Sequence, residues 1–118
     1  MVHKEFKINI DIINADRASL ILENTSQEHA FYVSDNQVIR SLQQLSEALS
    51  SMSYETYMHH VNPERNDFVS WVRDVVGDEW LSGRLAKVKD KDRAHSTVVR
   101  RVPYLQEVVR RKGLHESL

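Results

Sequence analysis

The chain has 118 residues, of which 41% are hydrophobic and 28% are charged, and this length and composition are typical of one globular domain with its own core. The absence of cysteine excludes disulfides, thiolate nucleophiles and cysteine-bound zinc. The net charge is −1, yet residues 84–112 carry ten Lys and Arg against three Asp and Glu, a local charge of +7.

The N-terminus and the apolar runs give no sign of export or membrane insertion. Residues 1–7 read Met-Val-His-Lys-Glu-Phe-Lys and lack the apolar core of a signal peptide. No apolar run approaches the ~20 residues that a membrane-spanning helix needs. We therefore expect a cytoplasmic protein that forms a single domain over residues 1–118 and has no membrane partner.

The first part of the chain, residues 4–39, is expected to be rich in β-structure. Residues 6–12 alternate apolar and polar side chains, which is typical of a strand with one buried face. The apolar residues 20–22 fit either a second strand or part of a short helix capped by Asp16.

A hairpin is predicted at the end of this part. Residues 30–33 and 37–39 are two short apolar runs that flank Ser34, Asp35 and Asn36. Because Asp and Asn tolerate left-handed backbone angles, the segment between the runs is expected to form the turn.

After Arg40 the apolar period changes from two to about 3.6 residues, which marks the start of a helical core over residues 41–88. Ser41 and Gln44 match a capping box, so we expect a helix over residues 41–52. Its apolar stripe consists of Leu42, Leu45, Leu49 and Met52.

Two further start signals follow this helix. Ser53 can cap a short helix on which Tyr54, Met58 and Val61 would share one face. The pair Asn62-Pro63 is the second signal, because proline at the first helical position loses no hydrogen bond. We therefore expect a helix to begin at each signal.

The next segment contains caps, a terminator and both tryptophans. Asn66-Asp67 is expected to cap a helix, and Gly77 to end it in the left-handed conformation. The apolar positions of this helix are Phe68, Trp71, Val72, Val75 and Val76. Asp78 can cap the next helix at once. That helix is expected to bury Leu81, Leu85 and Val88, with Trp80 at the margin.

The C-terminal part combines a charged connector, residues 87–93, with a basic helical segment, residues 94–112. Pro103 either starts a fresh helix or kinks a continuous one, because proline removes a donor and clashes one turn back. The apolar side consists of Val98, Val99, Val102, Leu105, Val108 and Val109. Together the elements predict an α+β fold, with a small N-terminal antiparallel β-hairpin or sheet packed against four to five short α-helices.

The run Asn-Asp-Phe-x-x-Trp-Val-x-Asp-Val-x-Gly-Asp, residues 66–78, resembles a family of small, functionally uncharacterised domains found mainly in archaea and in some bacteria. The resemblance covers residues 29–88, about half of the chain. The family often has Asp-Gly in the hairpin turn, where this chain has Asp35-Asn36. The resemblance implies a cytoplasmic prokaryotic module and transfers no functional residue.

The pair His59-His60 suggests a metal site, but its spacing does not fit one. Adjacent helical residues point about 100° apart, and helices that bind metal use histidines four residues apart. The other four histidines have no histidine partner at helical spacing. We therefore expect no metal site, and we assign His60 to packing or hydrogen bonding between helices.

An acidic cluster could be formed by Asp67, Asp74, Asp78 and Glu79. Asp67 and Asp78 stand where helix caps are needed, and Asp74 follows Arg73 on a polar face. The chain has no Gly-rich phosphate loop and no Ser-His-Asp pattern. We therefore expect no catalytic residue, no cofactor and no enzyme activity.

The tryptophans give the main functional hypothesis. Trp71 and Trp80 lie on successive predicted helices, and we expect both rings to pack between helices. A partly exposed ring would anchor a partner, since Trp, Tyr and Arg dominate binding hot spots. Trp80 is the better candidate, because it lies about 100° round its helix from Leu81. The hypothesis is a non-enzymatic interaction or regulatory module whose partner protein contacts Trp80, Tyr54 and Tyr57.

The alternative is a nucleic-acid-binding protein that uses the basic C-terminal helix for salt-dependent phosphate contacts. Its contact residues would be Arg100, Arg101, Arg110, Arg111 and Lys112. Against this alternative, the pI is only 6.6, and Asp90 and Asp92 interrupt the basic run. A third hypothesis is a homodimer built on the C-terminal helix.

Overall fold

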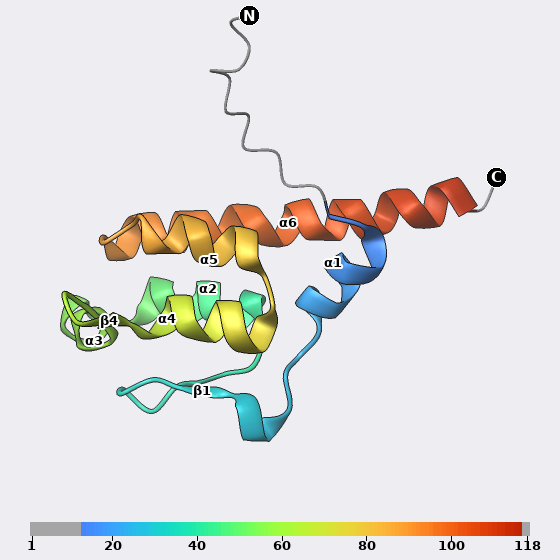
Figure 1. Cartoon of the computed structure of the whole chain (residues 1–118). Helices are drawn as coiled ribbons and strands as arrows, with labels where there is room; N and C mark the ends of the chain where they lie inside the picture. The colour runs from blue at the N-terminus through green and yellow to red at the C-terminus, as the bar shows by residue number, and fades with distance from the viewer. Residues whose placement is uncertain (1–12, 117–118) are drawn as a thin grey trace, which may run out of the picture.

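A computed structural model of the chain describes residues 13–116, with side chains described up to Leu114 (Figure 1). In these residues the predicted α+β class is confirmed by six α-helices and two small antiparallel hairpins. The strand predicted at residues 6–12 lies outside the described residues. In chain order the elements are α1 (Ala15–Leu22), the 3-10 turn η2 (Gln27–His29), β1 (Phe31–Tyr32), β2 (Val38–Ile39), α2 (Leu42–Ser51), α3 (Tyr54–His60), β3 (Val61–Asn62), β4 (Arg65–Asn66), α4 (Asp67–Trp71), the π-helical turn η3 (Val72–Val76), α5 (Glu79–Ala86) and α6 (Lys91–Glu116).

Helix α1 resolves the alternative left open for residues 20–22, which belong to a helix and not to a strand. Its cap is Asn14 rather than Asp16, because the Asn14 side chain accepts a hydrogen bond from the Arg17 amide at 2.8 Å. Ala18 and Ile21 face the core. The amphipathic pattern therefore directs one side of α1 onto the body of the protein.

The predicted hairpin is present between β1 and β2. The strands pair antiparallel with Phe31 opposite Ile39 and Tyr32 opposite Val38. The turn contains Asn36, whose φ of 78° is the left-handed value expected for an asparagine in a hairpin turn. The register buries Ile39 and leaves Tyr32 and Val38 exposed on the outer face.

The caps of α2 and α3 were predicted correctly. The Ser41 hydroxyl accepts from the Gln44 amide at 3.1 Å, and the Ser53 hydroxyl accepts from the Thr56 amide at 3.0 Å. These bonds satisfy amides that have no partner within the helix. The Gln44 side chain also reaches back and accepts from the Arg40 amide at 2.7 Å.

The face predicted for α3 was wrong. Tyr57 and His60 are buried, whereas Tyr54 and Met58 are about half exposed, at 53% and 49%. The Tyr57 ring stacks on Phe68 with a centroid distance of 6.0 Å, so the aromatic core decides which side of α3 turns inward. With only two turns of helix, the spacing of apolar residues did not distinguish the two faces.

The helix predicted to start at Asn62-Pro63 was also wrong, because Asn62 ends β3 and Pro63 begins the turn that leads to β4. The Asn62 side chain accepts from the Glu64 amide at 3.0 Å and donates to the His59 carbonyl at 3.2 Å. An asparagine that bonds two residues ahead makes a turn rather than a cap, and proline suits both structures.

The junction between α4 and α5 follows the predicted signals closely. The Asn66 side chain caps α4 by accepting from the Val69 amide at 3.1 Å. The helix then continues into the π-helical turn η3 and ends at Gly77, which has a left-handed φ of 85°. The Asp78 side chain caps α5 by accepting from the Leu81 amide at 3.1 Å. The sharp reversal at Gly77 therefore places Asp78 directly at the start of α5.

Helix α6 is a single element of 26 residues, about 39 Å long, that continues through Pro103. It begins at Lys91, earlier than the predicted residue 94, because the Asp90 side chain accepts from the Asp92 amide at 2.7 Å. Helices α1, α2 and α5 pack against it, as Figure 1 shows. One predicted apolar residue, Val99, is 41% exposed, on the same outer side as the exposed Pro103.

Candidate functional site

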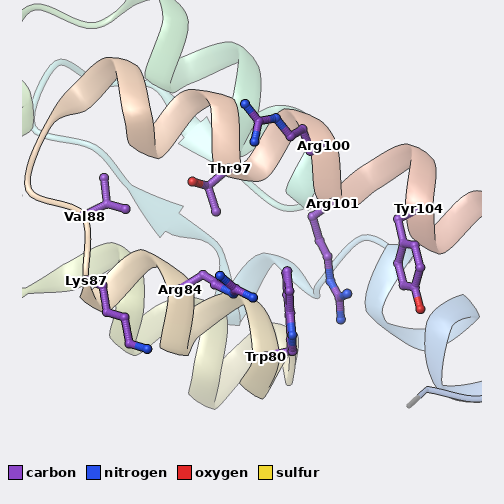
Figure 2. A pocket seen from close by; sticks show the side chains of 8 residues that line it. All are labelled: Trp80, Arg84, Lys87, Val88, Thr97, Arg100, Arg101 and Tyr104. Atoms are coloured by element: carbon purple, nitrogen blue, oxygen red, sulfur yellow. The ribbon is translucent and has the colours of Figure 1, made fainter. Parts of the chain in front are cut away.

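A groove of about 530 Å³ lies between α5 and α6 and is the best candidate site (Figure 2). Its lining consists of Trp80, Arg84, Lys87 and Val88 on the α5 side and Thr97, Arg100, Arg101 and Tyr104 on the α6 side. The residues recur mostly at helical spacings of three and four: one stripe runs along α5 and into the connection that holds Lys87 and Val88, and the other runs along α6. The short connection at residues 87–90 turns the chain back and sets the two stripes beside each other.

A buried ion pair fixes one end of the groove. The Arg101 guanidinium donates to both carboxylate oxygens of Asp78, at 2.8 and 2.9 Å. The side chains are only 2% and 1% exposed, respectively. Because Asp78 also caps α5 through the Leu81 amide, one carboxylate joins the start of α5 to the middle of α6. Bidentate geometry of this kind restrains both side chains.

The ring of Trp80 lies between two guanidinium groups, as Figure 2 shows. The guanidinium carbons of Arg84 and Arg101 are 4.7 and 4.6 Å from the ring centroid. These distances are in the range of favourable cation–π contacts. The Trp80 indole N–H is buried without a hydrogen-bond partner among the described residues. The tryptophan therefore acts as a wall of the groove, with both of its faces covered.

The groove is strongly positive. Four of its eight lining residues are cations and none is an acid. In the described part of the chain, no carboxylate forms an ion pair with Arg84, Lys87 or Arg100, all of which are exposed. Cations gathered in a concave site raise the local concentration of anions. The groove can therefore bind an anionic group without breaking an existing ion pair of these three residues.

The structure places only one of the three residues predicted to bind a partner in this groove. Trp80 lines it, but Tyr54 lies near the start of α6, where its hydroxyl donates to Asp92 at 3.0 Å. This hydrogen bond raises the pKa of Tyr54. Tyr57 is 1% exposed, and burial raises its pKa to about 12. A buried ring cannot contact a partner, so Tyr57 is not part of a docking surface in this structure.

The residues predicted to bind nucleic acid are dispersed. Arg100 and Arg101 line the groove, although Arg101 is held by Asp78. Arg110 and Arg111 both pair with Glu107, and these bonds lower the pKa of that carboxyl to about 2. Lys112 reaches α1 and donates to Asp16 at 2.8 Å. Most of the basic C-terminal segment is therefore engaged within the molecule.

Sequence reasoning missed Thr97 and Tyr104 as members of a site, and it considered Arg84 and Lys87 only as part of the basic run over residues 84–112. A signal was present, because residues 80–89 contain no Asp or Glu, and residues 93–106 contain none either. The two acid-free runs become the two walls of the groove. These two runs lie side by side because α5 packs against α6, and no pattern of neighbouring residues in the sequence predicts that packing.

His60 has a structural role in the described fold. Its Nδ1 lies 3.0 Å from Asp67 Oδ2, and its Nε2 accepts from the Ser34 amide at 3.1 Å. With both ring nitrogens engaged, His60 connects α3 to α4 and to the hairpin. Within residues 13–114, no group of three or more His, Asp or Glu side chains is arranged to hold a metal ion.

The acidic residues considered as a cluster have separate partners. Asp67 bonds to His60 and Arg65, Asp74 bonds to its neighbour Arg73, and Asp78 bonds to Arg101. The hydrogen bond from Arg73 lowers the pKa of Asp74. The carboxylates therefore do not converge on a common point.

No helix in the described part of the chain is both long enough and apolar enough to cross a membrane. Searches for similar proteins found no matching family model, no matching curated protein and no matching solved structure.

Proposed function

We propose that the protein is a non-enzymatic interaction module that binds another protein in the α5–α6 groove. The observation that carries this proposal is the set of exposed cations, Arg84, Lys87 and Arg100, around a groove whose lining contains no acid. Trp80 and Tyr104 add aromatic surface to the same site. Aromatic and arginine side chains together are the usual composition of a binding hot spot.

The restrained groove supports binding by a preformed surface. Asp78 and Arg101 hold the two walls together through buried hydrogen bonds, and the Trp80 ring packs on Arg101. A site that is already ordered loses less conformational entropy when a partner binds.

Nucleic acid fits this groove less well than protein. Bases bind single-strand sites by stacking on open aromatic faces, but both faces of Trp80 are covered by Arg84 and Arg101, and Arg101 also lies 5.3 Å from the centroid of the Tyr104 ring. Three available cations would give a salt dependence of only about two to three released counterions. Arg110 and Arg111, the outer part of the basic helix, are paired with Glu107.

A homodimer built on α6 is also less well supported than a protein partner in the groove. Such a dimer needs an apolar stripe that is free to pair with its copy. On α6 the stripe residues Val98, Val102 and Leu105 are 0 to 5% exposed, because α1 and α2 cover them. The groove between α5 and α6, by contrast, is accessible to a partner, because Arg84, Lys87, Arg100 and Tyr104 in its lining are exposed to solvent.

The test compares two variants with the same loss of charge. R84Q/R100Q removes two cations from the groove, and R110Q/R111Q removes two cations from the far end of α6. Each tagged protein is cross-linked in lysate with and without nuclease treatment, and the captured proteins are identified and quantified. We expect a stoichiometric protein that the parent chain and R110Q/R111Q retain and that R84Q/R100Q loses.

Two results would contradict the proposal. The first is a partner protein that all three chains capture equally. The second is capture that depends on nucleic acid and is lost with R110Q/R111Q. This result would favour the alternative function, nucleic-acid binding through the basic C-terminal helix. Circular dichroism of both variants provides the folding control, because the substituted residues are exposed.

A further inference from the structure

The dimensions of the groove restrict what can occupy it. On the α5 side the lining runs from Trp80 to Val88, two residues past the end of α5, a span of about 12 Å at the helical rise per residue. On α6 it runs from Thr97 to Tyr104, a similar length. An extended polypeptide covers about 3.3 Å per residue, so about four residues fill this length. A groove this short fits a linear segment rather than a large folded surface.

The charges are distributed over both sides of the groove. Arg84 comes from α5, Lys87 from the C-cap that follows it, and Arg100 from α6. In an extended chain, successive side chains point in opposite directions. Two adjacent acidic residues would therefore reach both helices, one to Arg84 or Lys87 and the other to Arg100. Two acids separated by one residue would point to the same side.

The remaining lining is suited to apolar side chains. Tyr104, at 43% exposure, and Trp80 lie at one end, and Val88 lies at the other. An apolar residue on each side of the acidic pair would cover these surfaces. Burial of apolar surface would add to the ion pairs, which contribute little when they remain exposed to solvent.

The surroundings favour carboxylates over phosphate. Phosphate sites usually include backbone amides at a helix N-terminus or in a turn. Here the cations Arg84 and Arg100 lie beyond the first turns of α5 and α6. At the N-terminus of α5, the Leu81 amide is already bonded to Asp78. The anion therefore meets side chains, and separate carboxylates match separate cations better than one compact phosphate does.

Building on the docking function proposed above, we propose that the occupant is a short extended segment of the partner with two adjacent acidic residues flanked by apolar ones. Arg84 and Lys87 bind one carboxylate, and Arg100 binds the other. Arg101 is a positioning residue, which Asp78 holds against Trp80. The segment is defined by chemistry and spacing, so short synthetic peptides can represent it.

The experiment is an NMR titration of the full chain labelled with ¹⁵N. The probe is acetyl-Leu-Glu-Glu-Leu-amide, whose acids are adjacent and whose pattern reads the same in both chain directions. The charge control is acetyl-Leu-Gln-Gln-Leu-amide. The spacing control is acetyl-Leu-Glu-Leu-Glu-amide, which has the same composition but places both acids on one side of an extended chain.

We expect the Glu-Glu peptide to cause saturable shifts in the Trp80 indole signal and in the amides of residues 80–88 and 97–104. W80F assigns that indole signal against the signal of Trp71, which donates to the His29 carbonyl. Affinity should fall about tenfold in R84Q/R100Q and by less than twofold in R110Q/R111Q. The Gln-Gln peptide should cause no saturable shift, and the spacing control should bind at least threefold more weakly.

Equal binding of the Glu-Glu and Gln-Gln peptides would overturn the acidic-segment proposal, and so would an equal affinity of the spacing control. Inorganic phosphate that gives the same shifts at lower concentration would overturn the preference for carboxylates. A failure here is distinct from failure of the docking function. If R84Q/R100Q still loses a captured protein while no peptide binds, the docking function stands and only the acidic segment is rejected.

Discussion

Asp78 and Arg101 are 23 residues apart in the chain, yet both carboxylate oxygens of Asp78 accept hydrogen bonds from the Arg101 guanidinium in the protein interior. The same carboxylate caps α5. One side chain therefore performs a local task, which starts a helix, and a long-range task, which attaches that helix to α6. The groove depends on the second task.

The first prediction separates these two tasks. Asp78→Asn retains a good helix cap but removes the counter-ion of Arg101. Breaking a buried ion pair from one side leaves the other charge poorly compensated, so we expect the free energy of unfolding to fall by about 3 kcal/mol. Urea denaturation followed by circular dichroism measures this change.

A double-mutant cycle provides the control for that prediction. In the Arg101→Met background the buried positive charge is absent, so Asp78→Asn should cost much less. The two substitutions should therefore couple by more than about 1 kcal/mol. Equal costs of Asp78→Asn in the two backgrounds would show that the ion pair contributes nothing beyond the cap.

The second prediction concerns a pair of glycines. Gly77→Ala should destabilise the protein by about 1 to 2 kcal/mol, because its φ of 85° is unfavourable for alanine. An added methyl group would have room, since the nearest atom, Nη2 of Arg17, is 3.7 Å away. Gly83→Ala, inside α5 with nothing within 4 Å, should instead stabilise by about 0.5 to 1 kcal/mol. Thermal unfolding of both variants tests the opposite signs, and a loss of stability in both would contradict the argument.

The third prediction is a pH dependence at the alkaline limit. The pKa of Tyr57 rises from 10.0 to about 12 because the ring is buried, so the fold favours the neutral phenol. This contribution to stability is fully present below pH 10 and is lost as the pH rises towards about 12. Urea midpoints measured across this range should fall less for Tyr57→Phe than for the parent chain. Identical declines would show that Tyr57 ionises as easily in the folded protein as in the unfolded chain.

The fourth prediction concerns Glu107, whose pKa falls from 4.5 to about 2 through its hydrogen bonds to Arg110 and Arg111. A depressed carboxyl pKa stabilises the fold above pH 4.5, and the contribution is lost as the pH falls towards about 2. The carboxyl carbon of Glu107, followed by NMR, should titrate with a midpoint near 2 in the parent chain. In R110Q/R111Q the midpoint should move back towards 4.5, and an unchanged midpoint would contradict the assignment of the cause.

Local signals in the sequence predicted most boundaries of the helical core. Ser41, Ser53, Asn66 and Asp78 each cap the helix that they were expected to cap, and Gly77 has its expected left-handed backbone. These predictions succeeded because a cap is decided by hydrogen bonds within three or four residues.

The two wrong predictions have different physical causes. At Asn62-Pro63 the same residues suit a helix start and a turn, and the hydrogen bonds of Asn62 to Glu64 and His59 form the turn. For α3 the buried face is set by packing of Tyr57 and His60 on Phe68, which belongs to another helix. The spacing of apolar residues within α3 does not contain that information.

The candidate site was predicted only in part for the same reason. Trp80 could be identified from its position at the margin of an apolar stripe, and the structure places it in the groove wall. Tyr104, on the opposite wall, lies 24 residues further along the chain. Their proximity follows from the packing of α5 on α6, and the Asp78–Arg101 pair that supports it joins residues with no local signal for each other.

Helix α6 has a consequence for how the protein is made. It is the last helix described, and α1 and α2, which are synthesised much earlier, bury their apolar sides against it. During synthesis α1 and α2 cannot pack until α6 has emerged from the ribosome, because a core built from early and late segments forms only when both are available. We therefore expect nascent chains that end before α6 to remain unfolded, so that stable folding begins only after α6 has emerged from the ribosome.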